Sequence, residues 1–281
     1  MAAVPPELTQ EIDQLNSSLP DRSELVVHAF GEAASSPPLE QGQLPRLRRV
    51  SIVIPTLNEQ QNVSKLILKI EALFPDEPEI IIVDDGSSDG TVDSIFSLRP
   101  RFTRIHVIQR SGRGGIGSAV RDGIQFALDH TDSDYVVTMD ADWSHDPAQL
   151  PTLLEAARDA DFVQGSRYAA GGMIVGWPRT RRLLSIVGNQ ACRILFQTGL
   201  REHTTFYRVF NRECAQLIVA NVHDDGYAWG VRSLVVALGA GLRAREVPIT
   251  FVERVNGKSK LGLREMIGWF FSIVRLLGQP R

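Results

Sequence analysis

Asp140 and Asp142 are the residues whose types and spacing most directly predict chemistry, because they follow the apolar run YVVTM at residues 135–139. On an extended chain, side chains two residues apart point to the same side, which would place the two carboxylates together. Neighbouring carboxylates repel each other, and a divalent cation removes that repulsion. Their hard oxygens suit Mg²⁺ or Mn²⁺ bound jointly with a diphosphate. We therefore predict a metal site here, against the alternative of a surface turn with scattered acids, and expect His145 to be a polar neighbour rather than a ligand.

Two further polar segments follow apolar runs earlier in the chain. Residues 55–59 read PTLNE, and residues 84–91 read DDGSSDGT. Small and turn-forming residues let a ligand approach the backbone closely, and Asp85 can accept hydrogen bonds from a base or a ribose. The alternative is a tight turn in which Ser88 or Asp89 caps a helix, and both interpretations can hold together.

The segment GRGGIG at residues 112–117 fits two functions. Taken alone, it matches the fingerprint of dinucleotide-binding proteins, with Asp140 at about the distance expected for the ribose-binding acid. That fingerprint normally opens a nucleotide-binding half, whereas two complete strand–helix units precede it here. We therefore favour a flexible loop at the start of a helix over a dehydrogenase.

Basic side chains on glycine-bearing segments characterise the second half of the chain. Arg167 lies in GSRY at residues 165–168, and Arg254 and Lys260 lie in RVNGKSKL at residues 254–261. Arginine and lysine suit the oxygens of diphosphates and phosphomonoesters. Each alone is more often a surface charge, but together with the acidic segments they predict a cleft whose two walls carry opposite charges.

The elements that must position these residues alternate between strands and helices. Continuous apolar strands separated by helices indicate a parallel sheet that is covered on both faces, and therefore an α/β fold. The ends of such parallel strands are where open α/β sheets bind ligands. The second half of the chain is less regular. The expected strands are 50–54, 79–83, 104–108, 135–139, 162–164 and 246–251, and the expected helices are 63–73, 91–98, 116–128 and 182–196.

Composition and charge narrow the class of protein. The 281 residues are 43% hydrophobic and 22% charged, which is ordinary for a globular protein and excludes a disordered, collagenous or coiled-coil chain. A net charge of −3 argues against a nucleic-acid binder. The halves differ, however, because residues 51–170 carry 19 acidic and 10 basic side chains, whereas residues 171–281 carry 7 acidic and 16 basic ones. The acidic part suits a metal, and the basic part suits phosphates.

Cellular location is constrained by what the sequence contains. The two cysteines, Cys192 and Cys214, cannot form a disulfide framework or a four-ligand zinc site, which favours a reducing compartment. The first residues lack the pattern of a signal peptide, and no run approaches the roughly 18 to 20 apolar residues that span a bilayer. We therefore expect the protein on the cytoplasmic side of any membrane that it contacts.

The motifs in their order resemble the family 2 glycosyltransferases of GT-A fold, and within them the dolichyl-phosphate or polyprenyl-phosphate mannosyltransferases. The segments are PTLNE, VDDGSSDGT, MDADWSHDP, GSRY, GW, and EVPI followed by RVNGKSKL, between about residues 50 and 261. The resemblance implies a GT-A catalytic domain over 49–261, with a Rossmann-like, mostly parallel sheet and helices on both faces. It also implies transfer of a hexose, with mannose from GDP-mannose favoured, to a polyprenyl or dolichyl phosphate by metal-dependent inverting displacement. The alternatives are UDP-glucose or another donor, and a non-catalytic member that binds nucleotide.

The same resemblance implies roles for individual residues. Pro55, Leu57 and Glu59 would border the base and ribose, and Val83 and Asp85 would hold the base and the ribose edge. The residues expected at the donor diphosphate are Asp140, Ala141 and Asp142, with both carboxylates on Mg²⁺ or Mn²⁺ and Ser144 nearby. The residues expected to bind the phosphates of donor and acceptor are Arg167, Arg254 and Lys260. Those expected to act in catalysis are Asp140, Asp142, Arg254 and Lys260.

Two departures from the family pattern bear on the sugar and the acceptor. Related enzymes commonly carry an Asp-x-Thr stretch with two small residues before an aromatic residue and Arg, where residues 202–208 read EHTTFYR. Thr205 and Phe206 replace the small residues, which predicts a narrower or reshaped pocket on that side. A position that is often Glu is Arg232. The metal and nucleotide predictions are unaffected, whereas the sugar and the acceptor stay open.

The two ends of the chain are predicted to lie outside the catalytic domain. Residues 1–48 are rich in proline and read as a flexible leader with a short helix around 7–15. Residues 262–281 predict a C-terminal amphipathic, largely apolar helix with Trp269 at its centre. Such a helix can lie in a membrane surface, and its alternatives are packing on the core or on a membrane-bound partner subunit.

Overall fold

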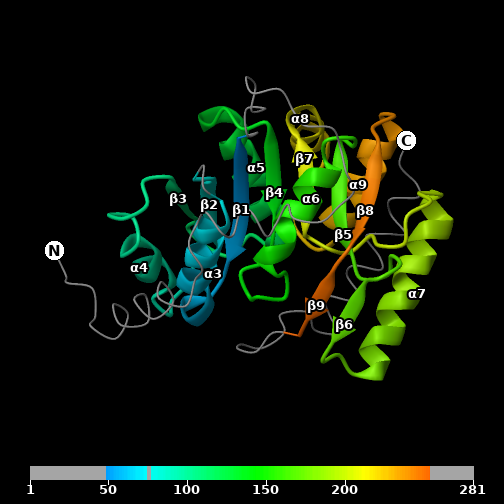
Figure 1. Cartoon of the computed structure of the whole chain (residues 1–281), viewed down its shortest axis with the longest axis horizontal. Helices are drawn as coiled ribbons and strands as arrows, with labels where there is room; N and C mark the ends of the chain where they lie inside the picture. The colour runs from blue at the N-terminus through cyan, green and yellow to red at the C-terminus, as the bar shows by residue number, and fades with distance from the viewer. Residues whose placement is uncertain (1–48, 75–76, 254–281) are drawn as a thin grey trace, which may run out of the picture.

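A seven-stranded sheet forms the centre of the protein in the computed structural model, which describes residues 49–74 and 77–253 (Figure 1). Its strand order is β3-β2-β1-β4-β7-β5-β8, and β6 and β9 form a separate two-stranded sheet. The strands are β1 (Val50–Thr56), β2 (Glu79–Asp84), β3 (Ile105–Gln109), β4 (Tyr135–Thr138), β5 (Phe162–Ser166), β6 (Met173–Val175), β7 (Arg208–Asn211), β8 (Ala244–Pro248) and β9 (Thr250–Val252). The α-helices are α3 (Gln60–Leu73), α4 (Thr91–Phe96), α5 (Ile116–His130), α6 (Leu150–Ala156), α7 (Arg179–Phe196), α8 (Arg212–Asn221) and α9 (Ala228–Gly239).

The sheet is mostly parallel, as the sequence predicts. Strands β3, β2, β1 and β4 run parallel to one another, and β5 runs parallel to β8. The exception is β7, which lies antiparallel between β4 and β5. The carboxyl ends of β1, β2 and β4 therefore reach the same edge, and the amino end of β7 joins them there.

Two hydrophobic layers cover the sheet because alternate residues of each buried strand face opposite sides. Ile52 and Ile54 of β1 pack with α3 and α6 on one face. Val53, between them, packs with α5, α8 and α9 on the other. The buried residues of both layers support the strand ends from beneath.

Several boundaries differ from the sequence predictions for physical reasons. Strand β1 continues through Pro55 to Thr56, because Pro55 lies near the strand end opposite Val83. The predicted strand over 246–251 is two strands in different sheets. The chain changes sheet at Ile249, whose N–H donates to the Ser166 carbonyl and whose carbonyl accepts from the Met173 N–H. Strands β6 and β7 and helices α6, α8 and α9 were not predicted.

The leader at 1–48 and the C-terminal helix at 262–281 lie outside the described residues, so both remain predictions. Within residues 49–74 and 77–253, no helix combines the length and the hydrophobicity that a bilayer crossing requires. Cys192 and Cys214 are both buried free thiols.

Close packing of α5 on the sheet generates a test of the fold. A Cβ atom on Gly123 would lie 2.3 Å from Val53 Cγ1 and 3.0 Å from Val83 Cγ2. We expect Gly123→Ala to lower the free energy of unfolding by about 1–3 kcal/mol, the usual cost of overpacking a core. Urea unfolding measures this. Gly239→Ala at the end of α9 is the control, because its Cβ would meet no atom of the described residues within 4 Å. An unchanged Gly123→Ala would contradict the packing of α5 against β1 and β2.

Candidate active site

The first two predicted loops lie side by side because β1 and β2 are parallel neighbours. Pro55 is opposite Val83, Thr56 is opposite Asp84, and the Asp85 N–H donates to the Thr56 carbonyl over 2.9 Å. Glu59 lies at the N-cap position of α3 and is buried, where its carboxylate accepts from the Asn62 side chain. The residues expected around a nucleoside are therefore brought to one edge of the sheet, and their roles remain predictions.

Polar side chains of the second loop hold the first loop in place. Asn58 adopts a left-handed backbone conformation (φ 55°), and its N–H donates to Ser87 Oγ. In return, its own Oδ1 accepts from the Ser88 N–H over 2.9 Å. Burial alone would raise the pKa of Asp89, but hydrogen bonds from the Thr91 hydroxyl and from backbone N–H groups lower it. Residues 84–91 therefore form a turn before α4, but the N-cap position is Gly90 rather than Ser88 or Asp89, and Asp89 accepts from the Thr91 N–H. The functional interpretation of this loop remains a prediction.

Asp85 is bound to the glycine segment of residues 112–117. Its Oδ1 accepts from the Gly114 N–H over 2.8 Å, and its Oδ2 accepts from the Gly115 N–H over 3.1 Å. The Arg110 guanidinium lies 3.0 Å from the same carboxylate. Asp85 is only 7% exposed. Its carboxylate therefore fixes the loop that precedes α5.

The glycine segment packs against residues 224–226 rather than presenting free amides. The N–H of Gly117, in the first turn of α5, donates to the Asp225 carbonyl over 2.8 Å. A Cβ atom on Gly115 would lie 2.4 Å from the Asp225 carbonyl oxygen, and one on Gly117 would lie 2.3 Å from that of Asp224. The glycines are needed for this contact, and the helix N-terminus that a pyrophosphate would use in a dehydrogenase is occupied by the protein itself.

Asp140 and Asp142 lie in a tight turn, not on extended chain, because β4 ends at Thr138. This corrects the geometry on which the metal prediction was based. The Ser144 N–H donates to Asp142 Oδ1 over 3.1 Å, and the Asp140 N–H donates to His145 Nδ1 over 3.0 Å. Trp143, which lies between Asp142 and Ser144, has a left-handed backbone (φ 64°). This conformation costs energy for a bulky residue and often marks a functional site.

The turn has the chemistry of a site for a divalent cation. Asp142 is 6% exposed and Ala141 is buried, so the second carboxylate is drawn into the protein. The hydroxyl of Ser144 is buried and finds no hydrogen-bond partner among the described residues. An unsatisfied buried hydroxyl beside two carboxylates fits a site that another oxygen-rich group completes. These residues therefore fit Mg²⁺ or Mn²⁺.

Arg167, which was expected on a phosphate, forms a buried ion pair with Glu202. Its Nε and Nη2 donate to the two carboxylate oxygens of Glu202 over 2.7 and 2.8 Å, and Nη2 also donates to Thr204 Oγ1. The guanidinium lies 5.1 Å from the centre of the Trp177 ring and 5.3 Å from that of Phe251. Burial raises the pKa of Glu202, but the charge and hydrogen bonds of Arg167 outweigh burial and hold it at about 2. Arg167 thus organises this wall of the site, and direct phosphate binding by it stays a prediction.

The segment 202–208 that departs from the family pattern lies beside the metal-site turn. Thr138 at the end of β4 donates from its hydroxyl to the Phe206 carbonyl. The Phe206 ring faces away into the core, where it stacks on Trp229 with ring centres 5.8 Å apart. Arg232 pairs with Asp224 over 3.5 Å. The Phe206 side chain is therefore accommodated by α9, and a narrower sugar or acceptor pocket remains a prediction.

The sequence predictions did not include Glu202 as a site residue or a structural role for His145. Glu202 was noted only as a departure, and its partner is 35 residues away in the sequence, so no local pattern could reveal the ion pair. His145 is buried, stacks on Tyr207 with ring centres 4.8 Å apart, and has its pKa lowered by burial to about 4. Its position three residues after Asp142 was the only available signal.

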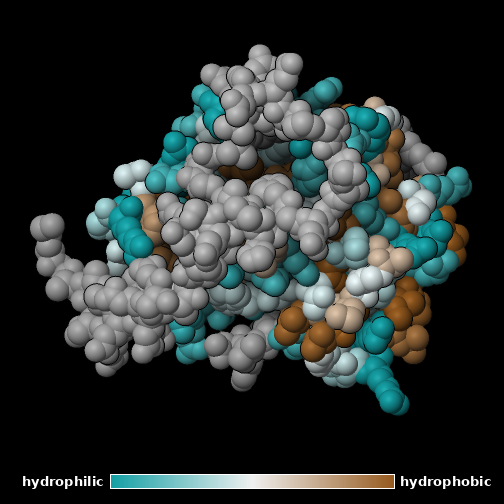
Figure 2. Space-filling model, in the orientation of Figure 1, coloured by the Kyte–Doolittle hydropathy of each residue, from teal (hydrophilic) through white to brown (hydrophobic). Residues whose placement is uncertain are grey.

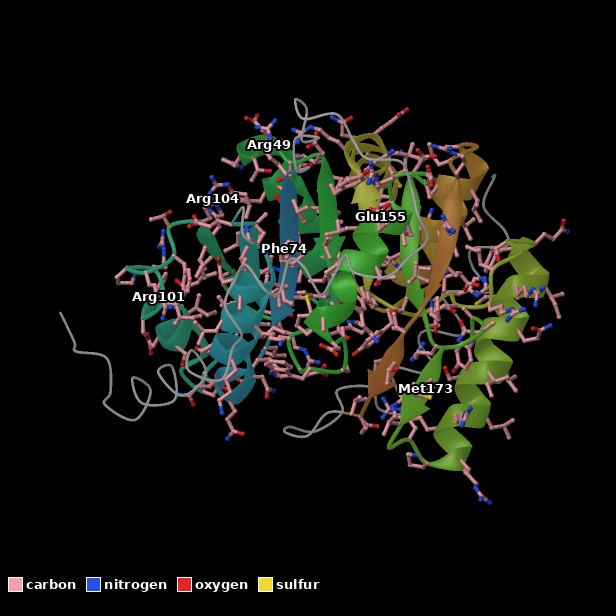
Figure 3. The ribbon with its side chains drawn as sticks, viewed as in Figure 1. Arg49, Phe74, Arg101, Arg104, Glu155 and Met173 are labelled. Atoms are coloured by element: carbon pink, nitrogen blue, oxygen red, sulfur yellow. The ribbon has the colours of Figure 1, made fainter. Side chains whose placement is uncertain are left out.

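Other predicted residues lie beyond this geometry. Arg254 and Lys260 are outside the described residues, and the described chain ends one residue before Arg254, at Glu253, which pairs with Arg181 of α7. A polar cavity of about 500 Å³ lies at the opposite edge, near Arg49 and Arg104, which Figure 3 labels at the amino ends of β1 and β3. On its lining, Arg49 pairs with Asp132 and Arg104 with Glu79, and the cavity lies at the end of the sheet opposite to Asp140 and Asp142.

A pH dependence of stability follows from His203, which lies fully buried next to Glu202. Burial lowers the pKa of His203 from 6.5 to about 4. Between these pH values the unfolded chain binds a proton that the folded chain excludes, so stability falls as pH falls. We expect His203 to contribute a slope of up to about 1.4 kcal/mol per pH unit.

Urea unfolding at several pH values between about 7.5 and about 4.5 measures this slope. His203→Asn should show a shallower slope, whereas His130→Asn, at the exposed end of α5, should match the unmodified protein. An unchanged slope in His203→Asn would show that His203 is not held neutral in the folded state.

The amino-acid sequence is similar to a known family profile and to proteins from two bacteria. The sequence profile described as Glycosyl transferase family 2 matches residues 51–218, more than half of the chain. The undecaprenyl-phosphate mannosyltransferase of Micrococcus luteus is 37% identical over 214 residues, covering 76% of this chain and 87% of that protein. The polyprenol monophosphomannose synthase of Mycolicibacterium smegmatis is 36% identical over 219 residues, covering 76% and 81%.

Solved structures show the same fold at low sequence identity. Glucosyl-3-phosphoglycerate synthase from Mycobacterium tuberculosis, in complex with Mn²⁺, UDP and glucosyl-3-phosphoglycerate, superposes with a TM-score of 0.62 at 20% identity, covering 84% of this chain and 82% of that chain. The same enzyme with Mg²⁺ and UDP gives 0.61 at 19% identity, covering 93% and 85%. The predicted fold and family are confirmed: the chain belongs to glycosyl transferase family 2 and is a glycosyltransferase with the GT-A architecture.

Proposed function

We propose that the protein transfers mannose from GDP-mannose to a polyprenyl or dolichyl phosphate, with inversion at the anomeric carbon. The observation that carries the proposal is the convergence of the loops after β1, β2 and β4 at one edge of the sheet, with Asp140 and Asp142 in the turn after β4. The two bacterial relatives are named for polyprenyl-phosphate mannosyl transfer, which supports the acceptor class and the sugar.

The proposed chemistry needs little from the protein as a base. The acceptor is a phosphomonoester with a second pKa near ~6, so it is already an anion at neutral pH and attacks directly. The difficult step is departure of the nucleoside diphosphate, on which negative charge develops. Asp140 and Asp142 would hold Mg²⁺ or Mn²⁺, which supplies positive charge to that leaving group.

The remaining residues of the site bind and orient in this proposal. The loops at 55–59 and 83–85 border the base and ribose, and Ser144 contributes its buried hydroxyl near the diphosphate. Arg254 and Lys260 bind phosphates from the segment after β9. Arg167 orients the phosphate-binding side of the site while it stays paired with Glu202.

A donor panel tests the proposal. Purified protein, polyprenyl phosphate and Mn²⁺ are combined with radiolabelled GDP-mannose, UDP-glucose or another sugar nucleotide, and lipid-extractable label is counted. We expect transfer from GDP-mannose, and near-complete loss of it in Asp142→Asn because a neutral amide then replaces the charged carboxylate that would bind the metal. Thermal unfolding of Asp142→Asn without ligand is the control and should show an intact fold.

The outcomes separate the alternatives. Transfer from UDP-glucose alone would replace the sugar and keep the reaction type. Nucleotide binding without transfer from any donor would indicate a non-catalytic member. Near-normal transfer by Asp142→Asn would show that the metal assignment is wrong.

We also propose that the protein works on the cytoplasmic face of a membrane, because its acceptor is a lipid. Helix α7 exposes an apolar stripe in which Leu183, Val187 and Ile194 are 61%, 58% and 64% exposed. Arg179, Arg182 and Arg193 fall on the adjoining side of the helix by its 3.6-residue period. Figure 2 shows the hydrophobic atoms along the edge occupied by α7. An apolar stripe next to arginines suits the surface of an anionic bilayer.

Flotation with anionic liposomes measures this membrane contact. We expect the triple variant Leu183→Gln, Val187→Gln, Ile194→Gln to float much less than the unmodified protein, because the apolar area that enters the interface is lost. Phe96→Gln, at an apolar side chain on α4 that is 40% exposed, is the control and should float normally. Truncation after Leu261 reports separately on the predicted C-terminal helix. Unchanged flotation of the triple variant would exclude α7 as a membrane contact.

A further inference from the structure

We infer that His145 is a positioning residue, which fixes the turn bearing Asp140 and Asp142 by accepting the Asp140 N–H at its Nδ1 atom. The inference rests on the proposed function only in that the turn is taken to hold a divalent cation. The geometry on which it stands is the 3.0 Å contact between Asp140 N and Nδ1 of His145, whose side chain is buried.

The hydrogen bond determines how the imidazole is protonated. Because Nδ1 accepts from a backbone N–H, the neutral ring carries its own hydrogen on Nε2. The imidazole then acts as a short strut across the six-residue turn, joining the side chain at its end to the backbone at its start. With the Ser144 N–H on Asp142 Oδ1, this fixes both the start and the middle of the turn.

The ring itself is held by two other elements of the fold. It stacks on Tyr207 with an angle of 15° between the planes, and it meets the edge of Phe251 at 76° with ring centres 5.8 Å apart. The backbone of His145 also forms an antiparallel bridge with Phe251 of β9. Tyr207 in turn donates its hydroxyl to the Asp146 carbonyl over 2.8 Å.

These contacts connect the turn to the segment that leads toward Arg254. Phe251 lies in β9, three residues before Arg254. Strand β9, which precedes the basic segment, therefore contacts the metal-site turn through the His145 ring. A left-handed Trp143 inside the turn is a strained conformation that needs such external support. His145 therefore sets the orientation of the carboxylates without touching the substrate or the reacting atoms.

Isosteric variants test this role. Asparagine places its Oδ1 close to the position of Nδ1 and can accept from the Asp140 N–H, whereas glutamine places its oxygen farther from the backbone and leucine offers no acceptor. His130→Asn, on an exposed histidine at the far edge, is the control. All variants are made in the full chain, and thermal unfolding records the general loss of ring packing.

The first readout is hydrogen exchange of the Asp140 amide in the protein without ligands. We expect slow exchange in the unmodified protein and in His145→Asn, and fast exchange in His145→Gln and His145→Leu. The second readout is the Mn²⁺ concentration that gives half-maximal binding of GDP. It should rise by about 10- to 100-fold in His145→Gln and His145→Leu, the range seen when groups that orient metal ligands are lost, and change little in His145→Asn.

Each result decides the inference. Equal exchange and equal Mn²⁺ dependence in all variants would overturn it, as would His145→Asn behaving like His145→Gln. Should His145→Leu fail to fold, the comparison of asparagine with glutamine still decides. Failure of the proposed function shows separately, because the unmodified protein would then bind GDP without any dependence on Mn²⁺, while the exchange of the Asp140 amide would still report on the strut.

Discussion

Buried carboxylates at the carboxyl edge of the sheet need hydrogen-bond donors, and meeting that need shapes the loops of the site. A carboxylate removed from water is strongly destabilised unless cations or N–H groups surround it. Asp85 is satisfied by two backbone amides and Arg110, and Glu202 by Arg167 and Thr204. In each case the acid ties together segments that are distant in the sequence. The loops around the site are therefore organised by charge as much as by the core below them.

The charged side chains of the site therefore have different roles. Arg167 has the residue type of a phosphate ligand, yet its fork is used on Glu202, and removal of one partner from such a buried pair is strongly destabilising. The helix N-terminus of α5 is likewise occupied, by the Asp225 carbonyl. Charge compensation for a departing diphosphate is therefore proposed to come from the cation at Asp140 and Asp142 and from the segment after β9. The acidic half of the chain is thus proposed to bind the cation, and the basic half to bind phosphates.

The parts of the fold that sequence predicted were those written in local patterns. The apolar runs that became β1, β2 and β4 lie within one or two residues of their predicted bounds, because a strand buried on both faces has an unbroken apolar sequence. Strand β7 was missed because four residues, RVFN, carry no period, and its placement depends on pairing with β4 and β5. The acidic pair at the end of β4 could be identified for the same local reason. The ion pair of Arg167 with Glu202 and the stacking of His145 on Tyr207 could not, since these partners lie far away in the sequence.

In the proposed reaction, the turn after β4 holds a divalent cation together with the diphosphate of a sugar nucleotide. Anomalous scattering from crystals grown with Mn²⁺ and GDP tests it most directly. We expect one manganese peak within bonding distance of carboxylate oxygens of Asp140 and Asp142 and of oxygens of the GDP diphosphate. GDP bound at the edge formed by β1, β2 and β4 with manganese absent or remote from both aspartates would contradict it.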